Sequence, residues 1–192
     1  MDEHAVVKIF AVCALAALAG CARREAQQSA APEAAPEAAQ AASAAKAVFE
    51  LASADFAAGA LMPAALSCDG ANLSPQLSWS GAPEGTKGYA LVLRDPDAPS
   101  GHFLHWAVTG LPASASSLAR GARPPSPARE LANDAGTGGY FGPCPPSGTH
   151  RYIFTLYALD SASAGSGPDI EGSLAPHTLA KTSLTGLYKR EK

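Results

Sequence analysis

The stretch of sequence that decides the fold is residues 95–112, which read Asp95-Pro-Asp-Ala-Pro-Ser-Gly-His-Phe-Leu-His-Trp-Ala-Val-Thr-Gly-Leu-Pro112. Its first part cannot be helical, because Pro96 and Pro99 fix φ, lack a backbone donor and push the preceding residue out of the α region. The following residues alternate as in a β-strand. The two faces of this strand would carry Phe103, His105, Ala107 and Thr109 on one side and Leu104, Trp106 and Val108 on the other. The pattern predicts a turn with two carboxylates, those of Asp95 and Asp97, beside a strand that presents His105.

These residues alone allow two interpretations. A carboxylate pair beside a histidine is typical of a binding site, but an exposed acidic turn next to a core histidine would have the same sequence. A second stretch, residues 139–159, favours the binding site. Its first half is rich in glycine and proline and predicts a rigid loop. Its second half predicts a long strand with His150 and Tyr152 on the same face.

The two stretches together resemble the phosphatidylethanolamine-binding protein family, and within it the bacterial Raf-kinase-inhibitor-like YbhB/YbcL branch. The matching motifs are Asp95-Pro-Asp-Ala-Pro99, His105-Trp106, Gly142-Pro-Cys-Pro-Pro146 and His150-Arg-Tyr152, with Cys68-Asp-Gly70, Asn72-Leu-Ser-Pro75 and His177-Thr-Leu-Ala-Lys181 matching the bacterial branch. The resemblance extends from about residue 47 to the end of the chain. It implies a Greek-key β-sandwich with a few peripheral helices.

The strand pattern independently predicts a mainly β fold. Short apolar runs separated by Gly/Pro turns are typical of a sandwich or barrel. The expected strands are Val48–Leu51, Leu77–Trp79, Tyr89–Leu93, Phe103–Thr109 and Tyr152–Leu159. The run Tyr89–Leu93 is apolar on both faces and is expected to be central. Residues 113–138 are expected to be loop, and the apolar spacing in residues 174–188 predicts a C-terminal helix.

The N-terminal segment is predicted to be a lipoprotein signal. Lys8 precedes an apolar run, residues 9–19, that is too short to span a bilayer and ends in Leu18-Ala-Gly-Cys21. This pattern predicts a signal peptide over residues 1–20 and lipidation of Cys21; an ordinary secretory signal is the alternative. Either signal would carry the protein out of the cytoplasm. Because alanine rather than aspartate follows Cys21, we expect a lipid-anchored protein of the cell envelope, at the outer membrane and facing the periplasm.

Two segments follow the predicted signal. Residues 21–46 hold the lipidated cysteine and a low-complexity Ala/Pro-rich stretch without large apolar side chains, which predicts a tether. Fully extended, such a tether would reach roughly 80 Å. Residues 47–192 are long enough for one domain with a sizeable core.

Cysteine usage also carries information. Cys13 would be lost with the signal and Cys21 would be acylated, which leaves Cys68 and Cys144 in an oxidising compartment. Both residues lie in Gly/Pro-bounded loops beside the predicted site. A disulfide between them is therefore expected, with two free thiols as the alternative.

The candidate site is a pocket for one small anion. The resemblance places Asp95, Pro99, His105, Pro145, Pro146, His150 and Tyr152 around such a pocket. The chemistry agrees, because imidazoles, a phenol and loop N–H groups can donate to a phosphate or carboxylate. Asp95 would orient the imidazoles, Asp97 is a further candidate, and Tyr140 would form an apolar wall. Phe103 and Leu104 replace the bulky tryptophans usual in the family, which leaves the width of the pocket open.

Other functions are less compatible with the sequence. The net charge is −3 and no basic patch occurs, which argues against nucleic acid as a partner. No metal-ligand spacing and no Gly-x-Ser-x-Gly motif occur either, so we expect neither a metal or cofactor nor an enzyme. The expected function is a binding module for a small anion or phospholipid head group, attached to the membrane through Cys21. A protein-inhibitor or interaction module with a protein partner is the alternative.

Overall fold

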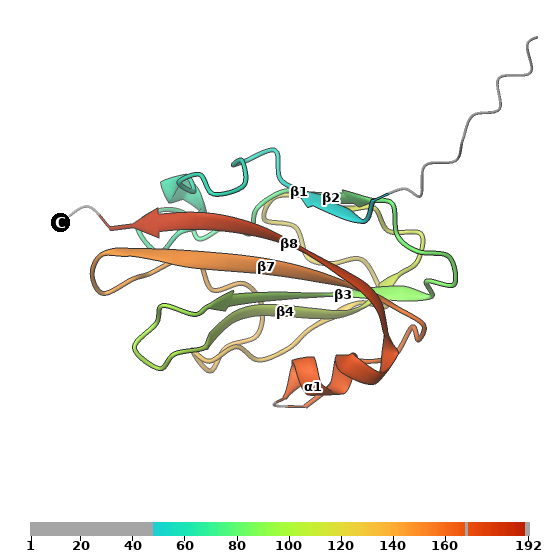
Figure 1. Ribbon diagram of the computed structural model, residues 1–192. Coiled ribbons are helices and arrows are strands. Elements are labelled where there is room, and N and C mark those ends of the chain that lie inside the picture. Colours follow the sequence, from blue (N-terminus) through green and yellow to red (C-terminus); the bar gives the residue numbers. More distant parts are fainter. Residues whose placement is uncertain (1–47, 168, 191–192) are drawn as a thin grey trace, which may run out of the picture. The chain divides into compact units, whose positions relative to one another are not determined.

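Two antiparallel β-sheets form the protein, whose structure is a computed structural model that describes residues 48–167 and 169–190 (Figure 1). The larger sheet has the order β6-β4-β3-β7-β8 and the smaller sheet has the order β1-β2-β5. The strands of the larger sheet are β6 (Arg129–Glu130), β4 (Phe103–Pro112), β3 (Gly88–Asp95), β7 (Thr149–Leu159) and β8 (Thr178–Lys189). The strands of the smaller sheet are β1 (Glu50–Ala52), β2 (Leu77–Ser80) and β5 (Ser117–Leu118). The predicted signal, the lipidation of Cys21 and the tether lie outside the described residues.

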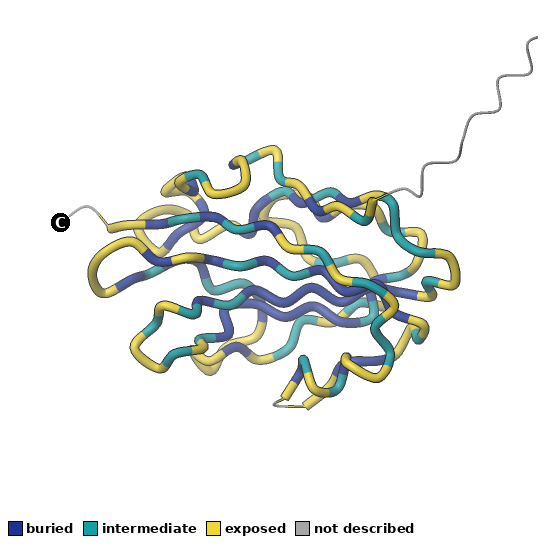
Figure 2. Tube along the Cα trace, viewed as in Figure 1, coloured by how far each residue is buried: buried dark blue, intermediate teal, exposed yellow. Residues whose placement is uncertain are grey.

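The mainly β prediction is confirmed, and each expected strand is present. Strand β3 is central, because β4 and β7 pair with its two edges and its residues are buried on both faces. Figure 2 shows this as a continuous dark stripe through the middle of the larger sheet, with exposed turns at both ends. Residues 113–138 are mostly loop, as expected, and also contain the two-residue strands β5 and β6.

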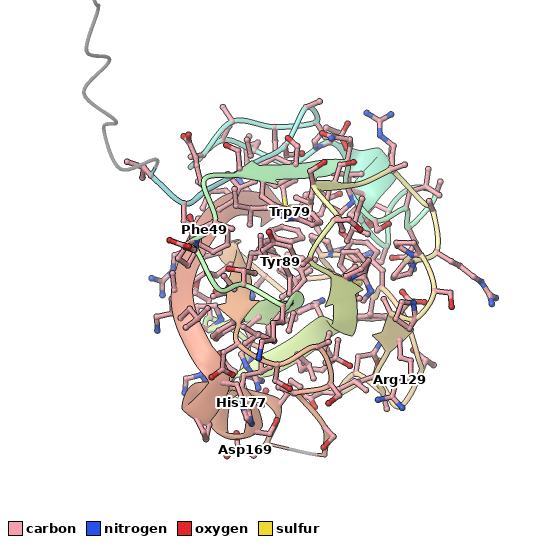
Figure 3. All side chains as sticks on the ribbon, turned by 90° about the vertical axis from the view of Figure 1, so that its right-hand side faces the viewer. Phe49, Trp79, Tyr89, Arg129, Asp169 and His177 are labelled. Atoms are coloured by element: carbon pink, nitrogen blue, oxygen red, sulfur yellow. A yellow bond between two sulfur atoms is a disulfide. The ribbon has the colours of Figure 1, made fainter. Side chains whose placement is uncertain are left out.

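The core has two parts, one on each face of the larger sheet. The first lies between the sheets and includes Leu77 and Trp79 of the smaller sheet against Leu91 and Phe154 of the larger one. Figure 3 looks at the end of the sandwich where Phe49, Trp79 and Tyr89 lie together, with the Trp79 and Tyr89 ring centroids 5.6 Å apart. The second part covers the other face and joins Val92, Leu104 and Ala107 to residues of the short helix α1 (Ile170–Leu174).

The predicted helix over residues 174–188 is wrong, because most of this segment forms strand β8. The only α-helix among the described residues is α1, which ends at Leu174 and is followed by a 3-10 turn, Ala175–His177. A second 3-10 turn, Ala64–Leu66, lies two residues before Cys68 in the sequence. No helix among the described residues is long and apolar enough to cross a membrane.

The burial pattern of β8 explains why the apolar spacing in residues 174–188 wrongly predicted a helix. Its inward residues are Leu184, Gly186 and Tyr188, which alternate with period two, whereas Leu179 is 43% exposed. The strand pairs with β7 along almost its entire length. Pairing with β7 along nearly the whole segment outweighs the helical spacing of a few apolar side chains.

Candidate functional site

A cavity of about 170 Å³ lies at one end of the sandwich, where β3 ends and β4 and β7 begin. The strands bring Asp95, His105 and His150 together, and the loops after β3 and before β7 supply the walls. The lining residues are Asp95, Ala98, Pro99, Phe103, His105, Phe141, Cys144, Pro145, Pro146 and His150. The predicted site residues Asp95, Pro99, His105, Pro145, Pro146 and His150 therefore lie around one cavity.

Asp95 and His150 form a buried pair in the cavity. The Nδ1 atom of His150 lies 2.7 Å from the Oδ2 atom of Asp95, so this nitrogen donates to the carboxylate. The Asp95 side chain is only 4% exposed. Its Oδ1 atom accepts a hydrogen bond from the backbone N–H of Asp97 at 2.8 Å, which fixes the turn after β3. The carboxylate thus sets the orientation of the His150 ring and leaves Nε2 as the nitrogen available to a ligand.

His105 is held by a different acceptor. Its Nδ1 atom lies 2.7 Å from the carbonyl oxygen of Phe141 and donates to it. Its Nε2 atom lies 4.0 Å from the Asp95 Oδ2 atom. The ring packs between Phe103 and Tyr152, with ring centroids 4.7 Å and 5.2 Å away. Burial lowers the pKa of His105 below its ordinary value, although the Phe141 carbonyl and the Asp95 carboxylate act in the opposite direction.

A β-bulge in β4 turns His105 toward the cavity. The pairing of β3 with β4 shifts register between Leu93 and Arg94, which face Trp106 and Leu104. His105 is therefore the extra residue, and such bulges re-aim side chains. The His105 ring packs on Tyr152, which belongs with Trp106 to the core between the sheets, whereas Leu104 and Ala107 belong to the opposite core. The predicted strict alternation along β4 is wrong at this point, because it places His105 and Trp106 on opposite faces.

The disulfide between Cys68 and Cys144 is present, with Cα atoms 5.4 Å apart. The disulfide joins Cys144, in the wall of the cavity, to the loop that contains Cys68. The same two loops are joined by hydrogen bonds from the Cys68 N–H to the Pro143 carbonyl at 3.1 Å and from the Gly142 N–H to the Asn72 side chain at 2.7 Å. The proline-rich wall is thus fixed from outside the cavity.

Three predicted site residues do not line the cavity. Asp97 binds Arg151, whose guanidinium lies 2.7 Å from its Oδ1 atom and holds the pKa of the carboxyl at about 2. The Tyr140 hydroxyl donates to the Leu66 carbonyl at 2.8 Å, and its ring packs on Trp106. Tyr152 is fully buried beneath His105. Burial and the adjacent Asp95 carboxylate raise the pKa of Tyr152, so its hydroxyl stays protonated.

Phe141 and Asn72 help to hold His105 in place and were not predicted as site residues from the sequence. Phe141 supplies an aromatic wall and the carbonyl that holds His105. Phe141 directly follows Tyr140, which was expected to form that wall. The path of the loop determines which of the two side chains lines the cavity. Asn72 has a left-handed backbone with φ of 54° and lies in a matched motif, but its contact with Gly142 is 70 residues away in sequence.

The charges at the cavity are few. Among the described residues that line it, Asp95 and the two histidines are the only titratable groups, and no lysine or arginine is present. The residues that the structure describes contain no group of three or more His, Cys, Asp or Glu side chains arranged to hold a metal ion. The arrangement offers two imidazole nitrogens to a ligand, with one carboxylate behind them.

A larger hollow, of about 790 Å³, lies near the start of β8. Its lining includes Phe49, Pro83 and Leu179, and Glu84 is the only titratable side chain among the described lining residues. Size alone favours this hollow, but polar groups do not converge on it. The smaller cavity is the better candidate, because convergent polar groups in an otherwise apolar cavity are typical of ligand sites.

Comparison with known proteins gives a consistent result. Residues 52–189 match the family model described as phosphatidylethanolamine-binding protein. A UPF0098 protein of Methanothermobacter thermautotrophicus is 42% identical over 137 residues, which cover 67% of this chain and 91% of that protein. LppC of Mycobacterium tuberculosis, which carries the name of a lipoprotein, is 41% identical over 72% of this chain and 71% of its own. The crystal structure of Escherichia coli YbcL, described as a member of the mammalian PEBP family, has a TM-score of 0.69 and 33% identity over 74% of this chain and 99% of YbcL.

Proposed function

The chain belongs to the phosphatidylethanolamine-binding protein family, and from this premise we propose that it binds one small anion, such as a phosphate or a phospholipid head group, in the cavity at Asp95, His105 and His150. The observation that carries the proposal is the position of the two histidines. Each has Nδ1 engaged with an internal acceptor, which leaves Nε2 for a ligand in a cavity of about 170 Å³. A volume of this size suits a group of a few heavy atoms.

We propose a binding role rather than catalysis. Among the described residues that line the cavity, none is a serine, threonine or lysine, and Cys144 is bonded to Cys68. The described lining residues therefore offer no hydroxyl, free thiol or amine as a nucleophile. The histidines and the carboxylate are sufficient for orientation and hydrogen bonding of an anion.

Replacing either cavity histidine by alanine is expected to weaken phosphate binding about 10- to 100-fold. A hydrogen bond to a charged group contributes about 1.5–3 kcal/mol, and each variant removes one. Calorimetric titration of the purified protein with phosphate and with phosphoethanolamine measures this change.

His177 provides the matched control for these two variants. His177 directly precedes β8, whereas His150 pairs with Tyr188 near the end of that strand. The His177 ring pairs with Asp160, with 2.9 Å between Nδ1 and Oδ1. His177→Ala should leave the phosphate affinity unchanged. If His105→Ala and His150→Ala bind phosphate as tightly as the parent protein, the histidines are core residues and the proposal is wrong.

We also propose that Cys21 carries a lipid that attaches the protein to a membrane of the cell envelope, the outer membrane being the expected one. The support is the Leu18-Ala-Gly-Cys21 motif after a short apolar run, together with similarity to a protein named as a lipoprotein. Cys21→Ser is expected to move the protein from the membrane pellet to the soluble fraction. A variant that still sediments with membranes at unchanged mass would disprove lipidation of Cys21.

A further inference from the structure

We infer that the cavity selects anions that carry an acidic proton, such as the monoanion of a phosphonate or of a phosphate monoester, over anions of the same shape without one. This inference rests on the proposed function, because it concerns the same cavity. It follows from the hydrogen-bonding capacity of the two histidines. His105 is fixed as an acceptor toward the cavity, and His150 is the group that can donate there.

The peptide group between Phe141 and Gly142 holds His105 in position, and Asn72 holds that peptide group from its other side. The Asn72 side chain accepts from the Gly142 N–H at 2.7 Å, and the carbonyl of the same peptide, that of Phe141, accepts from His105 Nδ1 at 2.7 Å. The Phe141 N–H in turn donates to the His105 carbonyl at 3.0 Å. These bonds hold the proton of a neutral His105 on Nδ1, because a carbonyl oxygen cannot donate. The remaining nitrogen, Nε2, then presents a lone pair.

The surroundings of His105 keep the ring neutral. Tyr152 packs on it from β7, His150 of β7 lines the same cavity, Asp95 faces it from β3, and Asp134 lies farther off in the loop after β6. The side chain is 4% exposed, and burial outweighs the two carboxylates, so the pKa of His105 is lowered. An ionised ligand oxygen placed at Nε2 would face a lone pair and be repelled. A ligand O–H placed there would donate a hydrogen bond.

His150 supplies the complementary group. Its Nδ1 atom donates to Asp95, so a protonated His150 donates from Nε2 to an ionised ligand oxygen. The charges of Asp95 and a protonated His150 then cancel, and no lysine or arginine among the described lining residues balances a second negative charge. One donor and one acceptor fit an oxyacid with one ionised and one protonated oxygen. A site built to accept a ligand proton rejects the analogue that lacks it.

Methylphosphonate and methanesulfonate are the probes that test this inference. They have nearly the same shape, and near pH 6.5, at the ordinary pKa of histidine, both are mainly monoanions. Only the phosphonate keeps an acidic proton. Calorimetric titration of the protein is expected to show that methylphosphonate binds at least about 10-fold more tightly than methanesulfonate.

Variants of Asn72 separate this mechanism from simple shape recognition. Asn72→Gly removes the acceptor of Gly142 and keeps a residue that tolerates the left-handed φ of 54°. It is expected to reduce the phosphonate preference several-fold and to change the imidazole ¹⁵N shifts of His105 away from those of a ring with its proton on Nδ1. Asn72→Asp keeps an acceptor oxygen and should retain both the preference and the shifts.

The outcomes distinguish this inference from the proposed function. Equal affinity for the two anions, or tighter binding of methanesulfonate, would overturn the inference and leave anion binding intact. Failure of both anions and of phosphate to bind would overturn both. A phosphonate preference that Asn72→Gly leaves unchanged, with unchanged His105 shifts, would show that the peptide between Asn72 and His105 does not set the selectivity.

Discussion

The alanine variant of Gly142 is expected to lose about 3 kcal/mol or more of its free energy of unfolding. A Cβ atom at this position would overlap the carbonyl oxygen of Leu66 and would lie 2.6 Å from the Asn72 Oδ1 atom and 3.0 Å from the Ser67 Cα atom. Two of these contacts are backbone, and the third accepts the hydrogen bond from the Gly142 N–H. The loops on both sides would have to separate. Because Phe141 would move with Gly142, phosphate affinity should fall as well.

Equilibrium unfolding in urea measures this loss, with Gly138→Ala as the matched control. Gly138 lies in the same loop, and nothing lies within 4 Å of a Cβ atom placed there. The control should change the free energy of unfolding by less than about 0.5 kcal/mol. Similar stabilities for the two variants would mean that the contact between the loops is not close.

Removing the disulfide is the second change that we expect to lower the free energy of unfolding by several kcal/mol. Replacing Cys68 and Cys144 by serine together releases a crosslink between residues 76 positions apart. A loop of this length corresponds to about 4 kcal/mol in the chain-entropy model, and measured losses are usually about 2–4 kcal/mol. The hydrogen bonds between the two loops remain in the folded state, so the fold should persist with a lower midpoint in urea.

The double serine variant also tests whether the wall of the cavity depends on the crosslink. Cys144 lines the cavity next to Pro145, so looser attachment of this wall should weaken phosphate binding. The parent protein treated with a reductant should reproduce both effects. An unchanged free energy of unfolding in the variant would contradict the expected role of the disulfide.

The strands were predictable because their signals are local. Alternation and flanking prolines define β4 and β7, and an apolar run on both faces places β3 at the centre. Strand β8 was not predictable in this way. Its apolar residues also fit helical spacing, and only its pairing with β7 over most of its length decides the conformation.

The candidate site was predictable in part for the same reason. Asp95, His105 and His150 stand at strand ends that the topology brings together, so their motifs were sufficient. Asp97 and Tyr140 were assigned from their positions in the loops beside the matched motifs, and neither lines the cavity. Their side chains bind Arg151 and the Leu66 carbonyl instead.

The remaining features depend on the meeting of distant loops. The bulge that turns His105 toward the cavity arises from the register of two strands, and no residue type marks it. The contact from Asn72 to Gly142 joins two loops, and strands β2 to β6 lie between these loops in the sequence. Such contacts are set by the fold as a whole, so a pattern within one segment cannot reveal them.

Histidine side-chain NMR during a phosphate titration tests the central claim most directly, because it observes the proposed ligand contacts themselves. We expect the imidazole signals of His105 and His150 to shift together and saturate with a single affinity, whereas those of His177 stay constant. Signals of His105 and His150 that remain unchanged at phosphate concentrations well above those of the protein, or that move only as much as those of His177, would contradict it.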